Sequence, residues 1–161
     1  WLLKAAENLY RLAPRNRNVL NNYAAVLLSE RVRPGQALAL TRENVLTSGP
    51  MAYHHLVNHA VALMLNGRLE EAHAFLRQVP SEKLPPDQLN SFYMAWFEYA
   101  YRTGQLARAR SFALKLSPDR LLPGDVAFLN DALSKMAPDS QSGEVIAVPA
   151  ELSTNPEPLL P

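Results

Sequence analysis

A nine-residue pattern that occurs twice constrains the fold of this chain more than any other feature. Residues 67–75 and 104–112 both read Gly-x-Leu-x-x-Ala-x-x-Phe, at a spacing of 37 residues. Extending the register backwards places Ala37 in the position of Ala72, at a spacing of 35 residues. A unit of this length holds two short helices but cannot bury an apolar face alone, so such units stack on one another. The repeat therefore predicts a row of helical hairpins.

The apolar residues of the chain recur with the period of a helix. Leu20, Tyr23, Ala24, Leu27 and Leu28 recur at intervals of three and four residues, which places them on one helix face. Alternation typical of strands is almost absent, and Pro or Gly residues separate the helical stretches. The pattern predicts an all-α fold, with helices at about residues 1–13, 18–31, 35–47, 51–66, 69–79, 86–103, 106–116 and 125–136.

The repeat resembles the tetratricopeptide repeat (TPR). In that family a small residue of the first helix packs against the second helix, Gly marks the turn, Ala opens the second helix and Pro closes it. The matching residues here are Ala24 and Ala60, Gly67 and Gly104, then Ala37, Ala72 and Ala109. Phe97 departs from the family pattern because it is bulky at the small position of the third repeat.

The resemblance implies a right-handed α–α superhelix, a TPR-like solenoid, over residues 1–136. Its parts are a partial repeat at 1–16, repeats at about 17–50, 53–80 and 90–118, and a closing helix at 124–136. Residues 137–161 contain five prolines and no helical period, which predicts a disordered or extended tail. The apolar run at 145–148 leaves open that the tail docks as a strand or on a helical surface.

Composition excludes several classes of function. The chain has no Cys, which excludes thiol nucleophiles, Cys-ligated zinc and disulfide frameworks. Its Lys and Arg residues are scattered over predicted helices and turns, so we expect no nucleic-acid partner. The sequence has no apolar run of the roughly 18 residues that a membrane span needs. A cytoplasmic and a periplasmic location both fit, and the start at Trp1 suggests that a signal or further repeats once preceded it.

The sequence has one cluster with the residue types of a metal site. His55 and His59 are four residues apart and share a helix face, but Leu56 stands where a zinc protease has Glu. We therefore expect no metal, with His59 packed between helices and His54 facing solvent or a groove. Because no Ser-His-Asp set, nucleophile elbow or Gly-rich phosphate loop occurs, the sequence predicts no enzyme and no cofactor.

The TPR resemblance implies that the first helix of each hairpin lines a concave groove. The predicted partner-binding residues are Asn18, Asn21, Ala25, His54, Val57, Asn58, Met94, Glu98, Tyr101 and Arg102. Glu98 is expected to face the groove or solvent, as carboxylates usually do. The family's carboxylate clamp is not reproduced, because Asn21 and Ala25 stand where it needs Lys and Asn.

These observations predict an adaptor or scaffold that binds a protein or peptide partner in its groove. Met and Tyr side chains there suit an extended segment or an amphipathic helix. The alternative is a structural segment without catalytic activity that associates with itself, as a homodimer, through an exposed apolar end.

Overall fold

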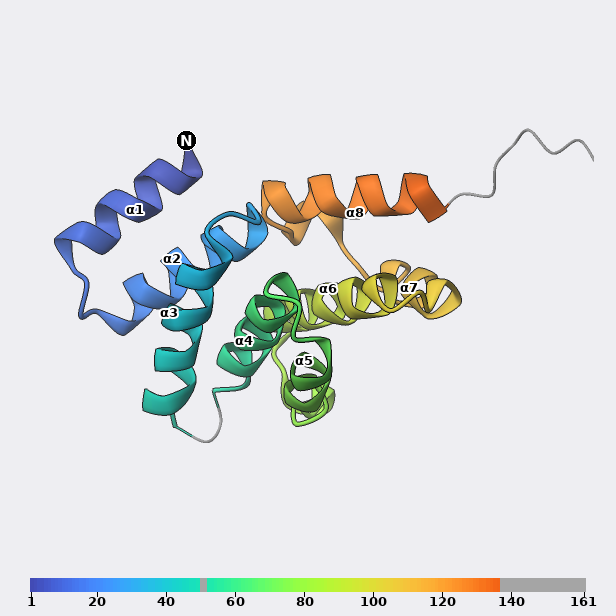
Figure 1. The fold of residues 1–161 in the computed structure, drawn as a ribbon, viewed down its shortest axis with the longest axis horizontal. Coiled ribbons are helices and arrows are strands. Elements are labelled where there is room, and N and C mark those ends of the chain that lie inside the picture. The colour runs from blue at the N-terminus through green and yellow to red at the C-terminus, as the bar shows by residue number, and fades with distance from the viewer. Residues whose placement is uncertain (50–51, 137–161) are drawn as a thin grey trace, which may run out of the picture.

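The computed structural model describes residues 1–49 and 52–136, and the predicted tail at 137–161 lies outside them. Within the described residues the fold is all-α, as predicted, and contains no strand (Figure 1). The helices are α1 (Leu2–Leu12), α2 (Arg17–Ser29), α3 (Pro34–Thr47), α4 (Tyr53–Leu65), α5 (Leu69–Leu76), α6 (Pro86–Arg102), α7 (Leu106–Ala113) and α8 (Pro123–Met136). Short 3₁₀ turns follow α5 and α7, at Ser81–Lys83 and Pro118–Arg120.

The helices pack mainly in chain order. Each helix from α1 to α7 contacts the next one along the chain, and α4 also contacts both α2 and α6. The first helices of the three hairpins, α2, α4 and α6, therefore lie next to one another and form a continuous surface, which we call the α2–α4–α6 face. The second helices, α3, α5 and α7, pack behind them.

Small residues allow the two helices of each hairpin to approach closely. Ala37, Ala72 and Ala109, one in each second helix, have no exposed surface. Ala24 and Ala60 in the first helices are equally buried, and so is the bulkier Phe97 at the third position. Three apolar clusters result, one around each hairpin, and the third includes residues of α8.

Two hairpin corners have the backbone that their glycines predict. Gly67 and Gly104 have φ angles of +76° and +73°, which glycine adopts without steric cost. After each glycine, the next N–H donates to a carbonyl five residues back: Arg68 to Leu63 at 2.9 Å and Gln105 to Ala100 at 2.8 Å. This is the Schellman arrangement, which satisfies the free carbonyls at a helix end.

The first corner has the same backbone but places Arg31 in the glycine position. Arg31 has a φ of +52°, and the N–H of Val32 donates to the Leu27 carbonyl at 3.1 Å. Arg31 lies 36 residues before Gly67, whereas Ala37 lies 35 residues before Ala72. The first hairpin therefore has one extra residue between its corner and its buried alanine, and Arg33 in this stretch also has a positive φ, at +50°.

The second helices α5 and α7 are shorter than predicted. They end at Leu76 and Ala113, whereas the sequence predicted ends at 79 and 116. In the turn after α5, the N–H groups of Gln78 and Val79 donate to carbonyls three residues back, so the chain tightens before it reaches Pro80.

The repeat of element boundaries extends to the start of α8. Helix α7, its 3₁₀ turn and the first residue of α8 each lie 37 residues after α5, its 3₁₀ turn and the first residue of α6. Helix α8 then departs from the pattern. It contacts α7 and the end of α2, and Figure 1 shows it running alongside α6 and α7 with its first turn beside α2.

Candidate functional site

The α2–α4–α6 face has two ends that differ in what covers them. One end, formed by the first turns of the three helices, is open, and we call it the open end. The other end lies beneath residues 120–125, where the chain enters α8, and we call it the covered end. A pocket of about 90 Å³ lies where residues 120–122 and Asp125 approach the middle of the face.

Two adjoining pockets lie at the open end. One has a volume of about 200 Å³ and is lined by Asn21, Ala25, His54, Val57, Asn58, Asp87, Gln88 and Ser91. The other has a volume of about 440 Å³ and includes Arg17, Asn18, Asn22 and His55. The lining is therefore dominated by amides and imidazoles, with Ala25 and Val57 supplying an apolar floor.

An amide pair bridges two helices at this end. The Asn58 side-chain N–H donates to the Asn21 side-chain carbonyl at 3.1 Å, which links α4 to α2. The Asn21 amino group and the Asn58 carbonyl have no partner among the described residues. The pair therefore presents one donor and one acceptor to the pocket, which is what a peptide backbone can engage.

Two neighbouring histidines at the open end are held in their neutral form. Burial, together with nearby His54 and Arg17, lowers the pKa of His55 to about 4. Burial also lowers the pKa of His54, although Asp87 opposes this shift. The His55 ring is within hydrogen-bond distance of the Ser48 hydroxyl, at 3.2 Å between Nδ1 and Oγ. Near neutral pH both rings are uncharged hydrogen-bonding groups.

At the covered end the backbone of α8 touches the backbone of α2. A Cβ atom placed on Gly124 would lie 2.3 Å from the Ser29 carbonyl oxygen, so no larger residue fits without movement. The backbone N–H of Asp125 donates to the Ser29 hydroxyl at 3.1 Å. Gly124 and the buried Ser29 therefore fix where α8 begins.

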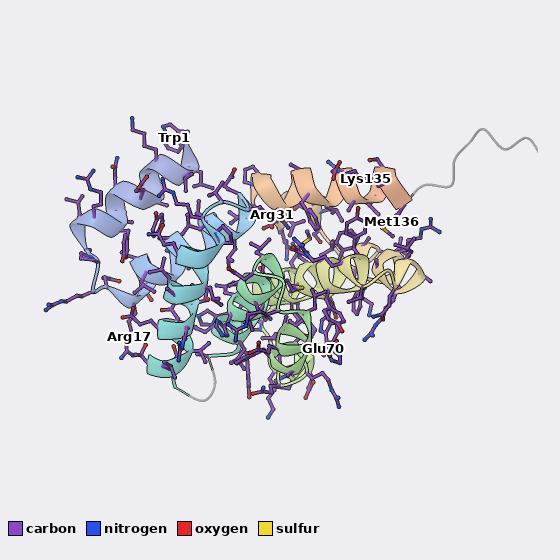
Figure 2. All side chains as sticks on the ribbon, in the orientation of Figure 1. Trp1, Arg17, Arg31, Glu70, Lys135 and Met136 are labelled. Carbon is purple, nitrogen blue, oxygen red and sulfur yellow. The ribbon has the colours of Figure 1, made fainter. Side chains whose placement is uncertain are left out.

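An ion-pair network, which we call the Arg31 latch, joins α2, α6 and α8. The Arg31 guanidinium lies 2.9 Å from a Glu98 carboxylate oxygen and 3.1 Å from an Asp125 oxygen. It also donates to the Ser29 carbonyl at 2.7 Å and lies over the Phe128 ring, 3.9 Å from its centroid. Figure 2 shows Arg31 between the α2–α3 corner and the first turn of α8. One side chain thus gathers the ends of three helices.

Glu98 lies at the centre of the latch. Its side chain is 1% exposed, and its second oxygen accepts from Arg102 at 2.8 Å. Exposure of Glu98 to solvent, one of the two predicted placements, was wrong, because the repeat pattern gave no sign of the cations that surround it. Glu98 does line the pocket in the middle of the face. Burial raises the pKa of its neighbour Asp125, and Arg31 opposes that rise.

The predicted site residues separate into two groups. Asn18, Asn21, Ala25, His54, Val57 and Asn58 lie together at the open end. Met94, Glu98, Tyr101 and Arg102 lie at the covered end. Met94 is buried in the cluster that includes Leu129, the Tyr101 ring is 6.0 Å from that of Phe128, and Arg102 pairs with Glu98.

Sequence reasoning missed four residues of the covered end: Ser29 as a cap for α8, Arg31, Gly124 and Asp125. One signal was available for Arg31. The first-helix residues Ala24, Ala60 and Phe97 can be aligned instead of the Ala of the second helix. This alignment places Arg31 where the other two repeats have Gly67 and Gly104. A charged residue in a glycine position indicates that its side chain is needed.

The remaining polar and apolar features lie away from this face. His59 is buried, with Nδ1 3.0 Å from the Thr41 hydroxyl, and its ring meets that of Phe75 edge-on. Within residues 1–49 and 52–136, no three His, Asp or Glu side chains gather as metal ligands would. Trp1, which precedes α1, is exposed, and so are Leu9 and Leu12 in the second half of that helix.

Comparison with known proteins gives no match. The chain matches no protein-family model, no curated protein and no solved structure. In the part of the chain that the structure describes, every helix is too short or too polar to cross a membrane.

Proposed function

We propose that this chain is a TPR-like repeat protein that binds an extended segment of a partner protein. In this proposal the hairpins form a right-handed superhelix whose concave surface is the α2–α4–α6 face. The boundaries of α5, of its 3₁₀ turn and of the start of α6 recur 37 residues later in α7, its 3₁₀ turn and the start of α8, and each hairpin has a left-handed corner, which supports the repeat. The binding site is the open end of the face, and the protein acts as an adaptor or scaffold without catalysis.

The amide pair of Asn21 and Asn58 carries the proposal. It places a free donor and a free acceptor from adjacent helices at the mouth of a pocket of about 200 Å³. A ligand backbone in extended form offers the complementary acceptor and donor, and one side chain can enter above Val57. The neutral imidazoles of His54 and His55 extend the same uncharged polar surface.

A peptide-display selection against the whole chain tests the proposal. Because Ser91 is exposed and lines the pocket, Ser91→Arg fills it without disturbing the core. Selected peptides should bind Ser91→Arg at least about tenfold more weakly, as expected when one contact region is blocked. Ser111→Arg, at an exposed serine of α7, is the matched control and should bind as the parent chain does.

Chemical-shift mapping gives an independent readout. Peptide addition should shift the side-chain amide signals of Asn21 and Asn58. Peptides that bind both serine variants equally, and that leave those amide signals in place, would show that the open end is not the site.

A further inference from the structure

Helix α8 fills a surface that the repeats alone would leave free. Each of α4 and α6 stacks on the first helix of the preceding hairpin, whereas α8 packs against α6 through residues such as Phe97 and also reaches α2 with its first turn. Its entry residues, together with Asp125, line the pocket in the middle of the α2–α4–α6 face. The covered end is therefore occupied by a segment of the same chain, joined to the repeats by one connector after α7.

The buried side of α8 has a regular amphipathic pattern. Asp125, Phe128, Leu129, Ala132 and Met136 recur at three- and four-residue intervals on one side of the helix. Asp125 pairs with Arg31, and Phe128 lies beneath the same guanidinium and against the ring of Phe97. The other three join the apolar cluster around Phe97. Arg31 therefore contacts both a carboxylate and an aromatic ring that lie one turn apart on α8.

The surface on which α8 packs, which we call the receiving surface, keeps an unpaired donor and some contact with water around Arg31. Arg31 Nε is buried and has no hydrogen-bond partner among the described residues. The Arg31 and Asp125 side chains remain 19% and 22% exposed, so water reaches the ion pair that holds the first turn of α8. Arg31 also keeps a left-handed backbone, with a φ of +52°, which is strained for a residue with a Cβ.

We propose that the covered end is a helix-binding site that α8 occupies as an intramolecular ligand. The external ligand is an amphipathic partner helix with a carboxylate one turn before an aromatic residue, and it competes with α8 for Arg31. This site is separate from the open end, so the inference does not depend on peptide binding there.

The test compares three full-length chains with one probe. The probe is a fluorescent peptide of residues 120–136. Gly124→Ala adds a methyl group that must push α8 off the Ser29 carbonyl while every residue of the receiving surface stays unchanged. Gly35→Ala is the matched control, because Gly35 also follows a proline at the start of a helix but has open space around its Cβ position.

Gly124→Ala should bind the probe about tenfold more tightly than the parent chain and Gly35→Ala, since the parent site is occupied most of the time. A probe with Asp125→Lys should lose this gain. Amide hydrogen exchange within α8 should be faster in Gly124→Ala only. Peptides selected for the open end should bind all three chains equally, which separates this proposal from the proposed function.

Three results would overturn the inference. Fast exchange of α8 in Gly124→Ala without probe binding would show that the surface accepts no helix from outside. Equal probe binding by all three chains would place the probe elsewhere. Unchanged exchange in Gly124→Ala would show that α8 is a fixed part of the fold.

Discussion

The two ends of the α2–α4–α6 face satisfy their polar groups in opposite ways. At the covered end the buried Glu98 carboxylate has two arginine partners, one from the α2–α3 corner and one from its own helix α6. At the open end most polar groups are amides and imidazoles, with Arg17 and Asp87 at its edges, and the Asn21–Asn58 pair leaves part of its hydrogen-bonding capacity unused. The covered end is filled by α8 of the same chain, whereas among the described residues no segment covers the open end.

The difference follows from the cost of burying charge. An ionised carboxylate removed from water is tolerated only where fixed cations and donors replace its hydration, so the covered end has to be built as a unit. A neutral amide at a pocket mouth keeps its contact with water and loses it only when a ligand supplies hydrogen bonds. Neutral polar groups and a buried ion-pair network can therefore occupy two ends of one face.

The largest expected effect comes from breaking the covered end at its centre. Glu98→Ala leaves Arg31 and Arg102 facing each other without the anion between them. We expect the free energy of unfolding to fall by about 3 kcal/mol, as for other broken buried pairs. For a chain of this size the thermal midpoint should drop by roughly 6 to 12 °C. Circular dichroism at 222 nm measures the midpoint.

Glu82→Ala is the matched control for that experiment. Glu82 is exposed in the 3₁₀ turn after α5, so its loss should change the free energy of unfolding by less than about 0.5 kcal/mol. A Glu98→Ala chain as stable as Glu82→Ala would mean that the latch contributes nothing net to stability.

A smaller effect is expected when the first corner is given the glycine of the other two. Arg31→Gly relieves about 1 kcal/mol of backbone strain but leaves buried Glu98 with one partner. We expect a net loss of about 2 kcal/mol. In a Glu98→Gln background the loss should nearly vanish, because only the pair with the partly exposed Asp125 is then lost and the relieved backbone strain offsets it. Urea unfolding of the four chains of this double-mutant cycle should give a coupling of about 2 kcal/mol.

Gly67→Ala supplies the comparison at a corner without a latch. The alanine must adopt the positive φ of Gly67 with nothing to compensate, and the expected loss is about 1 kcal/mol in any background. Strictly additive effects of Arg31→Gly and Glu98→Gln would show that the two side chains do not support each other.

Most of the fold could be predicted from the sequence because the signals are local. Gly67, Gly104 and the buried alanines set the hairpin corners and the close approach of helices, and these repeat along the chain. The placement of α8 could not be predicted in this way. Its contact with α2 depends on Gly124 and Ser29, which lie 95 positions apart and whose types carry no periodic signal.

The candidate site also has a part that local sequence signals predict and a part that depends on α8. Residues of the open end, such as Asn21 and His54, sit where the repeat register puts them, because neighbouring first helices pack regularly. Glu98 and Tyr101 follow the same register, yet Arg31 and α8 cover them, so that Glu98 is buried and Tyr101 is half-buried against Phe128. A register predicts which way a side chain points, and it does not predict what arrives from a distant part of the chain to cover it.

The last expected effect is the pH dependence of the open end. The folded pKa of His55 is about 4, below its unfolded value near 6.5. Between these values the unfolded chain binds a proton that the folded chain does not, so stability should fall as the pH falls from 6.5 towards 4 and level off below that. His55→Gln should flatten this slope, whereas Asn18→Gln, at the same end and without a titrating group, should keep it. Thermal midpoints at pH 7, 6 and 5 measure the slope, and equal slopes in both variants would mean that His55 is protonated in the folded chain as readily as in the unfolded one.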